Sequence, residues 1–151
     1  MEKDMVILLV DDEERFLSTT SKLLRRLGYQ VKTASSGRQA LEMLLDIDFP
    51  VVVLDVKMPG MDGIETLREI KRRFPMAEVI MLTGHATVES AIEGMENGAF
   101  DFLMKPTDIN HLIHKAEAAF RRRQTLESKI RMARSRGTAG DQSGSNGNHK
   151  D

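Results

Sequence analysis

The stretch from Val51 to Leu54 most constrains the fold of this chain, because it holds only apolar residues and three of them are β-branched. Such a run predicts a short strand buried on both faces, which is typical of a parallel sheet covered by helices. Asp55 follows directly, and Pro59 and Gly60 then break the pattern. Asp55 is therefore expected at the carboxyl edge of the sheet, where α/β sheets bind ligands. A simple turn Asp beside Pro and Gly is the alternative, and this stretch alone leaves both open.

Further apolar segments alternate with helical patterns along the rest of the chain. A helical spacing of apolar residues follows each predicted strand, Ser36 with Gln39 predicts a capping box, and Thr107 or Asp108 is expected to cap the last helix from Ile109. Together they predict an α/β domain with a five-stranded parallel sheet, helices on both faces and right-handed crossovers. The other strands are predicted at residues 5–10, 29–34, 78–82 and 99–104.

Composition narrows the class of protein. The chain has 151 residues, of which 40% are hydrophobic and 30% charged, as expected for one globular domain. It has no Cys, which excludes disulfides and thiolate metal sites. No apolar run approaches the length of a membrane span, and the first residues do not resemble a signal peptide. A cytoplasmic location without membrane contact is therefore expected.

The net charge of −1 conceals an asymmetry along the chain. Residues 121–136 carry seven basic side chains against the single acidic Glu127, whereas the first 120 residues are acidic overall. Residues 137–151 are rich in Gly, Ser and Asn and have no apolar pattern. The predicted organisation is a globular domain in residues 1–120, a basic helical extension of the last helix in residues 121–136, and a disordered tail in residues 137–151.

The last helix and its extension carry a heptad pattern, in which eight positions step alternately by three and four residues. The first half is expected to pack on the sheet, whereas the second half has three open interpretations: self-association as a homodimer, electrostatic contact with nucleic acid or an acidic partner, or a soluble tail. Sequence-specific DNA binding is disfavoured, because aromatic residues and a second recognition helix are missing from the pattern. The heptad seam consists of Ile109, Leu112, Ala116, Ala119, Arg123, Leu126, Ile130 and Ala133.

Polar side chains follow four of the five predicted strands: Asp11 and Asp12, Asp55, Thr83, and Lys105. In a parallel sheet these ends share one edge, so the side chains can converge. Three carboxylates about 4 Å apart repel by roughly 4 kcal/mol per pair, so they either hold protons or bind a hard cation such as Mg²⁺. Lys105 suits a phosphate oxygen. The set predicts a metal-assisted phosphoryl site with Asp55 as nucleophile, although an acidic first helical turn is the alternative for the run at Asp11.

These residues, in their order and spacing, resemble the receiver domain of two-component response regulators. The resemblance covers about residues 4–120 and implies a flavodoxin-like, doubly wound (βα)5 fold with strand order 2-1-3-4-5. It also implies a cytoplasmic phosphorylation switch in a phosphorelay, rather than an enzyme acting on outside substrates. It rests on Asp11-Asp12, Asp55 with residues 58–63, Thr83-Gly84 and residues 98–106.

The resemblance assigns roles to the residues of the acidic site. Asp55 would accept a phosphoryl group from a histidine kinase or phosphotransfer protein. Asp11, Asp12 and Asp55 would hold Mg²⁺ together with the backbone carbonyl of Lys57. Lys105 would bind a phosphoryl oxygen.

The resemblance also implies switch residues and an output. Thr83 would move towards the phosphoryl group, Phe102 would rotate inward, and the Lys105–Pro106 peptide bond would be cis. Many receivers have Tyr where this chain has Phe102, which keeps the packing change and loses the hydroxyl. His85 either lines the path of the hydrolytic water or is an ordinary exposed loop residue. The face formed by the fourth helix, the fifth strand and the fifth helix would contact a downstream effector protein or, on phosphorylation, a second copy.

Residues 76–106 further resemble receivers of enhancer-binding transcriptional activators, whose ATPase and DNA-binding domains have no counterpart in this sequence, so the output stays open. One alternative function is a phosphorylation-independent dimerisation or scaffold module driven by the extension. Another is a metal-dependent phosphatase. The dehalogenase-like phosphatases carry a second Asp two residues after the nucleophile, and Lys57 stands there instead, which disfavours that alternative.

Overall fold

The computed structural model describes residues 4–57, 62–84 and 87–147, and it describes only the backbone of residues 138–147. Strands and helices alternate from the start of the described chain to its end, as the sequence predicts. They are β1 (Val6–Val10), α1 (Glu14–Arg26), β2 (Gln30–Ala34), α2 (Gly37–Asp46), β3 (Val51–Leu54), α3 (Gly63–Arg73), β4 (Glu78–Thr83), α4 (Val88–Glu96), β5 (Asp101–Met104) and α5 (Ile109–Gly147).

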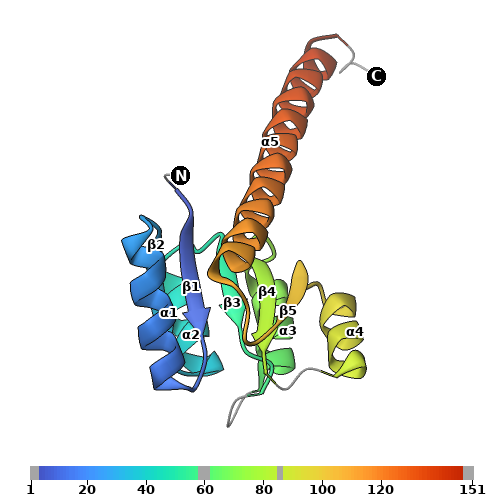
Figure 1. Ribbon diagram of the computed structural model, residues 1–151. Coiled ribbons are helices and arrows are strands. Elements are labelled where there is room, and N and C mark those ends of the chain that lie inside the picture. Colours follow the sequence, from blue (N-terminus) through green and yellow to red (C-terminus); the bar gives the residue numbers. More distant parts are fainter. Residues whose placement is uncertain (1–3, 58–61, 85–86, 148–151) are drawn as a thin grey trace.

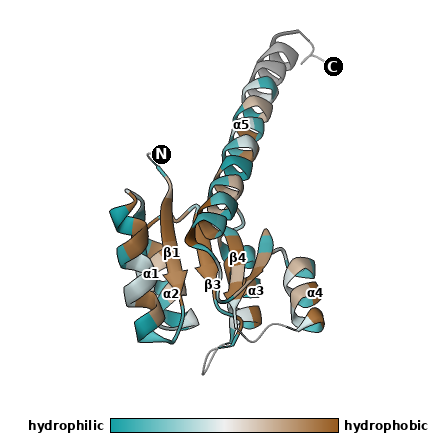
Figure 2. Ribbon diagram, viewed as in Figure 1, coloured by the Kyte–Doolittle hydropathy of each residue, from teal (hydrophilic) through white to brown (hydrophobic). Residues whose placement is uncertain are grey.

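The strands form one parallel sheet in the order β2-β1-β3-β4-β5, which confirms the predicted topology (Figure 1). Consecutive residues of β1 pack on opposite faces: Leu8 joins the cluster with α2 and α3, and Leu9 joins the cluster with α1 and α5. All of Val51–Leu54 is buried. Figure 2 shows β1, β3 and most of β4 as hydrophobic, as expected for strands covered on both faces.

Side-chain caps begin several of the helices. Ser36 caps α2 by accepting a hydrogen bond from the Gln39 backbone N–H at 3.1 Å. The Gln39 side chain accepts from the Ser35 N–H at 2.7 Å instead of returning to Ser36, so the predicted capping box forms only in part. Asp108 caps α5, because its Oδ1 accepts from the Asn110 N–H at 3.2 Å. Each cap satisfies an N–H that the first helical turn leaves without an intrahelical partner.

Helix α5 continues well beyond the sheet and projects away from the domain (Figure 1). It runs through residues 137–147, for which the composition predicts disorder. An α-helix can continue without tertiary packing, because its backbone hydrogen bonds are internal, although Gly, Ser and Asn are weak helix formers. The division of the chain into domain, extension and tail stays a prediction.

Two arginines anchor the base of the extension at the amino ends of the strands. Arg122 donates to both carboxylate oxygens of buried Glu78, at 2.5 and 2.7 Å, and its guanidinium lies 4.9 Å from the Phe100 ring centroid. Arg123 is only 7% exposed, and its Nη2 lies 2.5 Å from Asp48 Oδ2. Arg123, the charged residue of the heptad seam, thus forms an ion pair with the domain.

Replacement of Arg123 by Met is expected to leave the free energy of unfolding unchanged or to raise it by about 1 kcal/mol. The Arg123 Nη1 is buried without a hydrogen-bond partner among the described residues, and the side chain of Asp48 is 74% exposed, so solvent screens the attraction. Arg123→Ala should instead cost roughly 2 kcal/mol, because it also removes packing. Denaturant unfolding of both variants measures this, and equal losses in both would contradict it.

Candidate functional site

The carboxyl ends of four strands bring the predicted site residues to one edge of the sheet. Asp11 follows β1, Asp55 follows β3, Thr83 ends β4 and Lys105 follows β5. The sheet hydrogen bonding continues past the strands, because the Asp55 N–H donates to the Val10 carbonyl and the Lys105 N–H to the Thr83 carbonyl, each at 3.0 Å. The backbone therefore fixes where each side chain starts.

Three carboxylates converge at this edge, and we call Asp11, Asp12 and Asp55 the acidic cluster. One oxygen from each lies within 4.8 Å of the others. Asp11 and Asp55 are 1% and 4% exposed, whereas Asp12 is exposed. Two buried carboxylates and one facing solvent make an all-oxygen site with an open side, which fits a hard, partly hydrated divalent cation such as Mg²⁺.

Lys105 supplies the positive charge beside the acidic cluster. Its Nζ donates to Asp11 Oδ2 at 2.6 Å and to Glu13 Oε1 at 3.3 Å, and it lies 4.0 Å from the Phe16 ring centroid. The sequence analysis did not identify Glu13 or Phe16 as neighbours of Lys105. Glu13 directly follows the Asp11-Asp12 pair and Phe16 comes four residues after Asp12, and this closeness in sequence is the signal that could have identified them.

The environment shifts two pKa values in the site. Burial raises the pKa of Asp11, against hydrogen bonds from the Lys105 ammonium and the Glu13 N–H, and the nearby charge of Asp55 raises it further. Burial by itself would lower the pKa of Lys105, but its hydrogen bond and attraction to Asp11 outweigh this effect and raise it. Lys105 therefore stays charged at neutral pH.

The loop after β3 packs closely around Asp55. The Lys57 N–H lies 3.4 Å from Asp55 Oδ1, and the Gly63 N–H donates to the Val56 carbonyl at 2.7 Å. A Cβ at Gly63 would collide with backbone atoms of Asp55 and Val56, so only Gly allows this approach. Residues 58–61 of the predicted motif and His85 lie outside the described residues.

The predicted switch residues, Thr83 and Phe102, differ in burial. Thr83 is fully buried, and Phe102 is partly buried and packs against the core cluster shared with α2 and α3. At Gly84 a Cβ would meet no atom closer than the Lys105 Cβ at 3.9 Å, so this position has room beside it. The Lys105–Pro106 peptide bond is cis.

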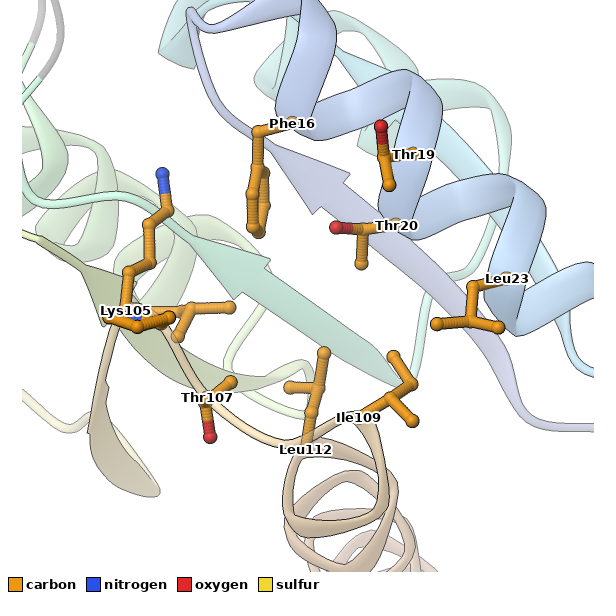
Figure 3. A pocket seen from close by; sticks show the side chains of 10 residues that line it. Phe16, Thr19, Thr20, Leu23, Lys105, Thr107, Ile109 and Leu112 are labelled. Atoms are coloured by element: carbon orange, nitrogen blue, oxygen red, sulfur yellow. The ribbon is translucent and has the colours of Figure 1, made fainter.

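A cavity of about 520 Å³ adjoins Lys105 between α1 and the start of α5 (Figure 3). Phe16 and Leu23 line it from α1, and Ile109 and Leu112 line it from α5. The walls are mainly apolar, and Lys105, which pairs with Asp11 of the acidic cluster, brings a charge to the lining. The sequence analysis did not predict this cavity, because the spacing of apolar residues in a helix does not show where two helices separate.

The fold and the site together define a regulatory receiver, and comparison with known proteins agrees. Residues 7–117 match the family described as the response regulator receiver domain. The chain belongs to this family, whose members are regulatory switches of two-component signal transduction.

Curated relatives match over most of this chain but only part of their own length. The transcriptional regulatory protein ZraR of Escherichia coli is 41% identical over 123 residues, which are 82% of this chain and 28% of that protein. The regulatory protein AtoC of Escherichia coli is 37% identical over 125 residues, which are 83% of this chain and 27% of that protein. The chain thus spans a little over a quarter of these relatives, and the predicted resemblance to receivers of transcriptional regulators is confirmed.

Solved receiver structures share the fold. A receiver domain from Clostridium thermocellum is 38% identical with a TM-score of 0.76, and the match covers 81% of this chain and 98% of that one. A receiver domain protein from Methanospirillum hungatei is 29% identical with a TM-score of 0.77, with the same coverage of both chains. Among the described residues, no helix is long and apolar enough to cross a membrane.

Proposed function

We propose that Asp55 accepts a phosphoryl group from a histidine kinase or phosphotransfer protein, with Mg²⁺ held by Asp11, Asp12, Asp55 and the backbone carbonyl of Lys57. The observation that carries the proposal is the convergence of three carboxylates within 4.8 Å of one another beside the ammonium of Lys105. Structural ion pairs do not need three carboxylates around one cation, whereas a phosphoryl site needs both an anionic nucleophile and cations.

In the proposed transfer, a carboxylate oxygen of Asp55 attacks phosphorus as the bond between phosphorus and the donor imidazole nitrogen breaks. The imidazole leaves with its electron pair and takes up a proton, and Asp55 becomes an acyl phosphate. Bound Mg²⁺ would supply positive charge for the phosphoryl oxygens. Lys105 would exchange its hydrogen bond to Asp11 for one to a phosphoryl oxygen.

The phosphodonor is proposed to dock over the cavity between α1 and α5. A docking protein must deliver its phosphohistidine to Asp55. Lys105 lines this cavity (Figure 3) and also contacts Asp11 of the acidic cluster. The apolar lining of the cavity offers a surface that a protein partner can bury.

The output is proposed to pass through the face formed by α4, β5 and α5. Val88 and Ile92 of α4 and Met104 of β5 are 72%, 52% and 53% exposed, an apolar surface that is typical of protein contacts. Phosphorylation of Asp55 would draw in the hydroxyl of Thr83 and rotate Phe102, changing this face for a downstream effector protein or a second copy.

The experiment that tests the proposal is incubation of the full chain with a small acyl phosphate and Mg²⁺, followed by intact mass spectrometry. We expect one phosphoryl group per chain, and none after chelation of Mg²⁺. Absence of labelling at saturating donor would overturn the proposal, as would equal labelling with and without the metal.

The affinity for Mg²⁺ is expected to fall as the pH is lowered, beginning above the usual Asp pKa of about 3.9. The raised pKa of Asp11 means that a proton competes with the metal at a higher pH than at an ordinary Asp. In the metal-free chain the folded state holds the Asp11 proton more tightly than the unfolded state does. The free energy of unfolding should therefore be highest below the pKa of Asp11 in the unfolded chain, and it should fall as the pH rises through the pKa in the folded chain. Metal titrations between about pH 4 and pH 8 measure the affinity, and a constant value would contradict this prediction.

A further inference from the structure

The extension presents an uncovered apolar stripe that continues the buried seam of α5. Leu112, Ala116 and Ala119 of the heptad seam are buried against the sheet. The next apolar seam residues, Leu126 and Ile130, are 39% and 40% exposed, and the helix has left the domain at this point (Figure 1). The side of α5 that is buried in the domain is therefore exposed farther along the helix, where another protein can contact it.

Positive charge predominates beside this stripe. Within residues 127–136, the positions beside the seam, called e and g in a heptad, are occupied by Glu127, Lys129, Arg134 and Arg136. Glu127 accepts a hydrogen bond from Arg123 of its own helix at 3.0 Å. The cations that remain at e and g have no such intrahelical partner among the ion pairs of the described residues.

The flanking charges disfavour pairing with a second copy of the chain. In a parallel pair of helices, position g of one helix faces the following position e of the other, so Lys129 would face Arg134 of the second copy. In an antiparallel pair, g faces g, which again brings like charges together because Lys129 and Arg136 are both basic, whereas e offers Glu127 as well as Arg134. Like charges at these positions oppose association, because e and g pairs set partner choice in coiled coils.

We propose that the extension binds an acidic amphipathic helix of a partner protein, as a two-stranded coiled coil. Leu126 and Ile130 would contact the apolar seam of that helix, and Lys129, Arg134 and Arg136 would face Glu or Asp at its e and g positions. The contact does not require phosphorylation of Asp55, so it goes beyond the proposed function. The receiver would then bind this partner protein whether or not Asp55 carries a phosphoryl group.

The probe is a synthetic helical peptide of about four heptads with a Leu and Ile seam and Glu at every e and g position. A control peptide has the same seam with Lys at those positions. With the full, unphosphorylated chain, fluorescence anisotropy should show the Glu peptide binding at least about tenfold more tightly than the Lys peptide, with an affinity that falls as salt rises. Equal affinity for the two peptides would overturn the proposal.

Two double variants with the same change in net charge locate the interaction. Lys129→Glu with Arg134→Glu reverses the flanks, and it should weaken binding of the Glu peptide by at least about tenfold and favour the Lys peptide. Arg121→Glu with Arg131→Glu reverses two cations on the outer face, and it should change the affinity by less than about threefold. Circular dichroism confirms that both variants fold, and equal loss of binding in both would reject the proposed face.

Two further experiments measure binding to other anionic partners and association with a second copy of the chain. Duplex DNA and vesicles of anionic phospholipid should each bind the chain more weakly than the Glu peptide at about 0.15 M salt. Analytical ultracentrifugation should find the free chain monomeric at the concentrations used. Tighter binding to DNA or to vesicles would overturn the proposal, and so would self-association that the Glu peptide cannot displace.

Discussion

Replacement of Asp55 by Asn should abolish phosphoryl incorporation and at the same time stabilise the metal-free fold. The amide retains the shape of the carboxylate but is not a nucleophile, so no acyl phosphate forms at this position. Asp55 is 4% exposed and belongs to a cluster in which each pair of charges repels. Removal of one charge should therefore raise the free energy of unfolding by about 1 kcal/mol without Mg²⁺.

A matched control for this variant is Asp62→Asn. Asp62 caps α3 by accepting from the Glu65 N–H at 2.9 Å, and Asn is an equally good cap, so this change should alter neither labelling nor stability. Intact mass spectrometry and denaturant unfolding give both readouts. Labelling of Asp55→Asn at the wild-type level would refute Asp55 as the phosphoacceptor, and a loss of stability would refute the repulsion argument.

The fold was predictable because each strand carries its own signal. Val51–Leu54 has no polar residue and is buried throughout, and the regular alternation of strands and helices leaves a parallel sheet as the solution. The convergence of Asp11, Asp55 and Lys105 follows from the same fact, since the carboxyl ends of parallel strands share one edge. Strand order was available only through the resemblance to receivers, because no local pattern specifies it.

Contacts between distant elements could not be predicted in this way. Arg123 lies at a heptad position where its charge argues for exposure, yet Asp48 from the loop before β3 pairs with it and the side chain is buried. Lys105 contacts Glu13 across the sheet edge, a pairing that depends on how α1 begins. Both contacts join segments more than seventy residues apart in the chain, and periodicity carries no information over that separation.

Replacement of Lys105 by Ala is expected to slow phosphoryl transfer by about a hundredfold while raising the affinity for Mg²⁺. The ammonium lies 2.6 Å from Asp11 Oδ2, where it would stabilise charge on the transferring phosphoryl group. In the resting site the same ammonium competes with a metal ion for the Asp11 carboxylate, so its removal increases the negative charge available to Mg²⁺. The two measured quantities, the labelling rate at saturating Mg²⁺ and the metal dissociation constant, should therefore move in opposite directions.

The opposite signs separate a chemical role of Lys105 from a structural one. If Lys105 only supported the fold, its loss would weaken metal binding and phosphoryl transfer together. Lys115→Ala is the matched control, because Lys115 also pairs with a carboxylate at 2.6 Å, that of Asp101, but belongs to an ion pair separate from the acidic cluster. It should change neither quantity by more than about twofold. A weaker metal affinity in Lys105→Ala would show that the ammonium organises the carboxylates rather than competing for them, and the phosphoryl contact proposed for it would lose its support.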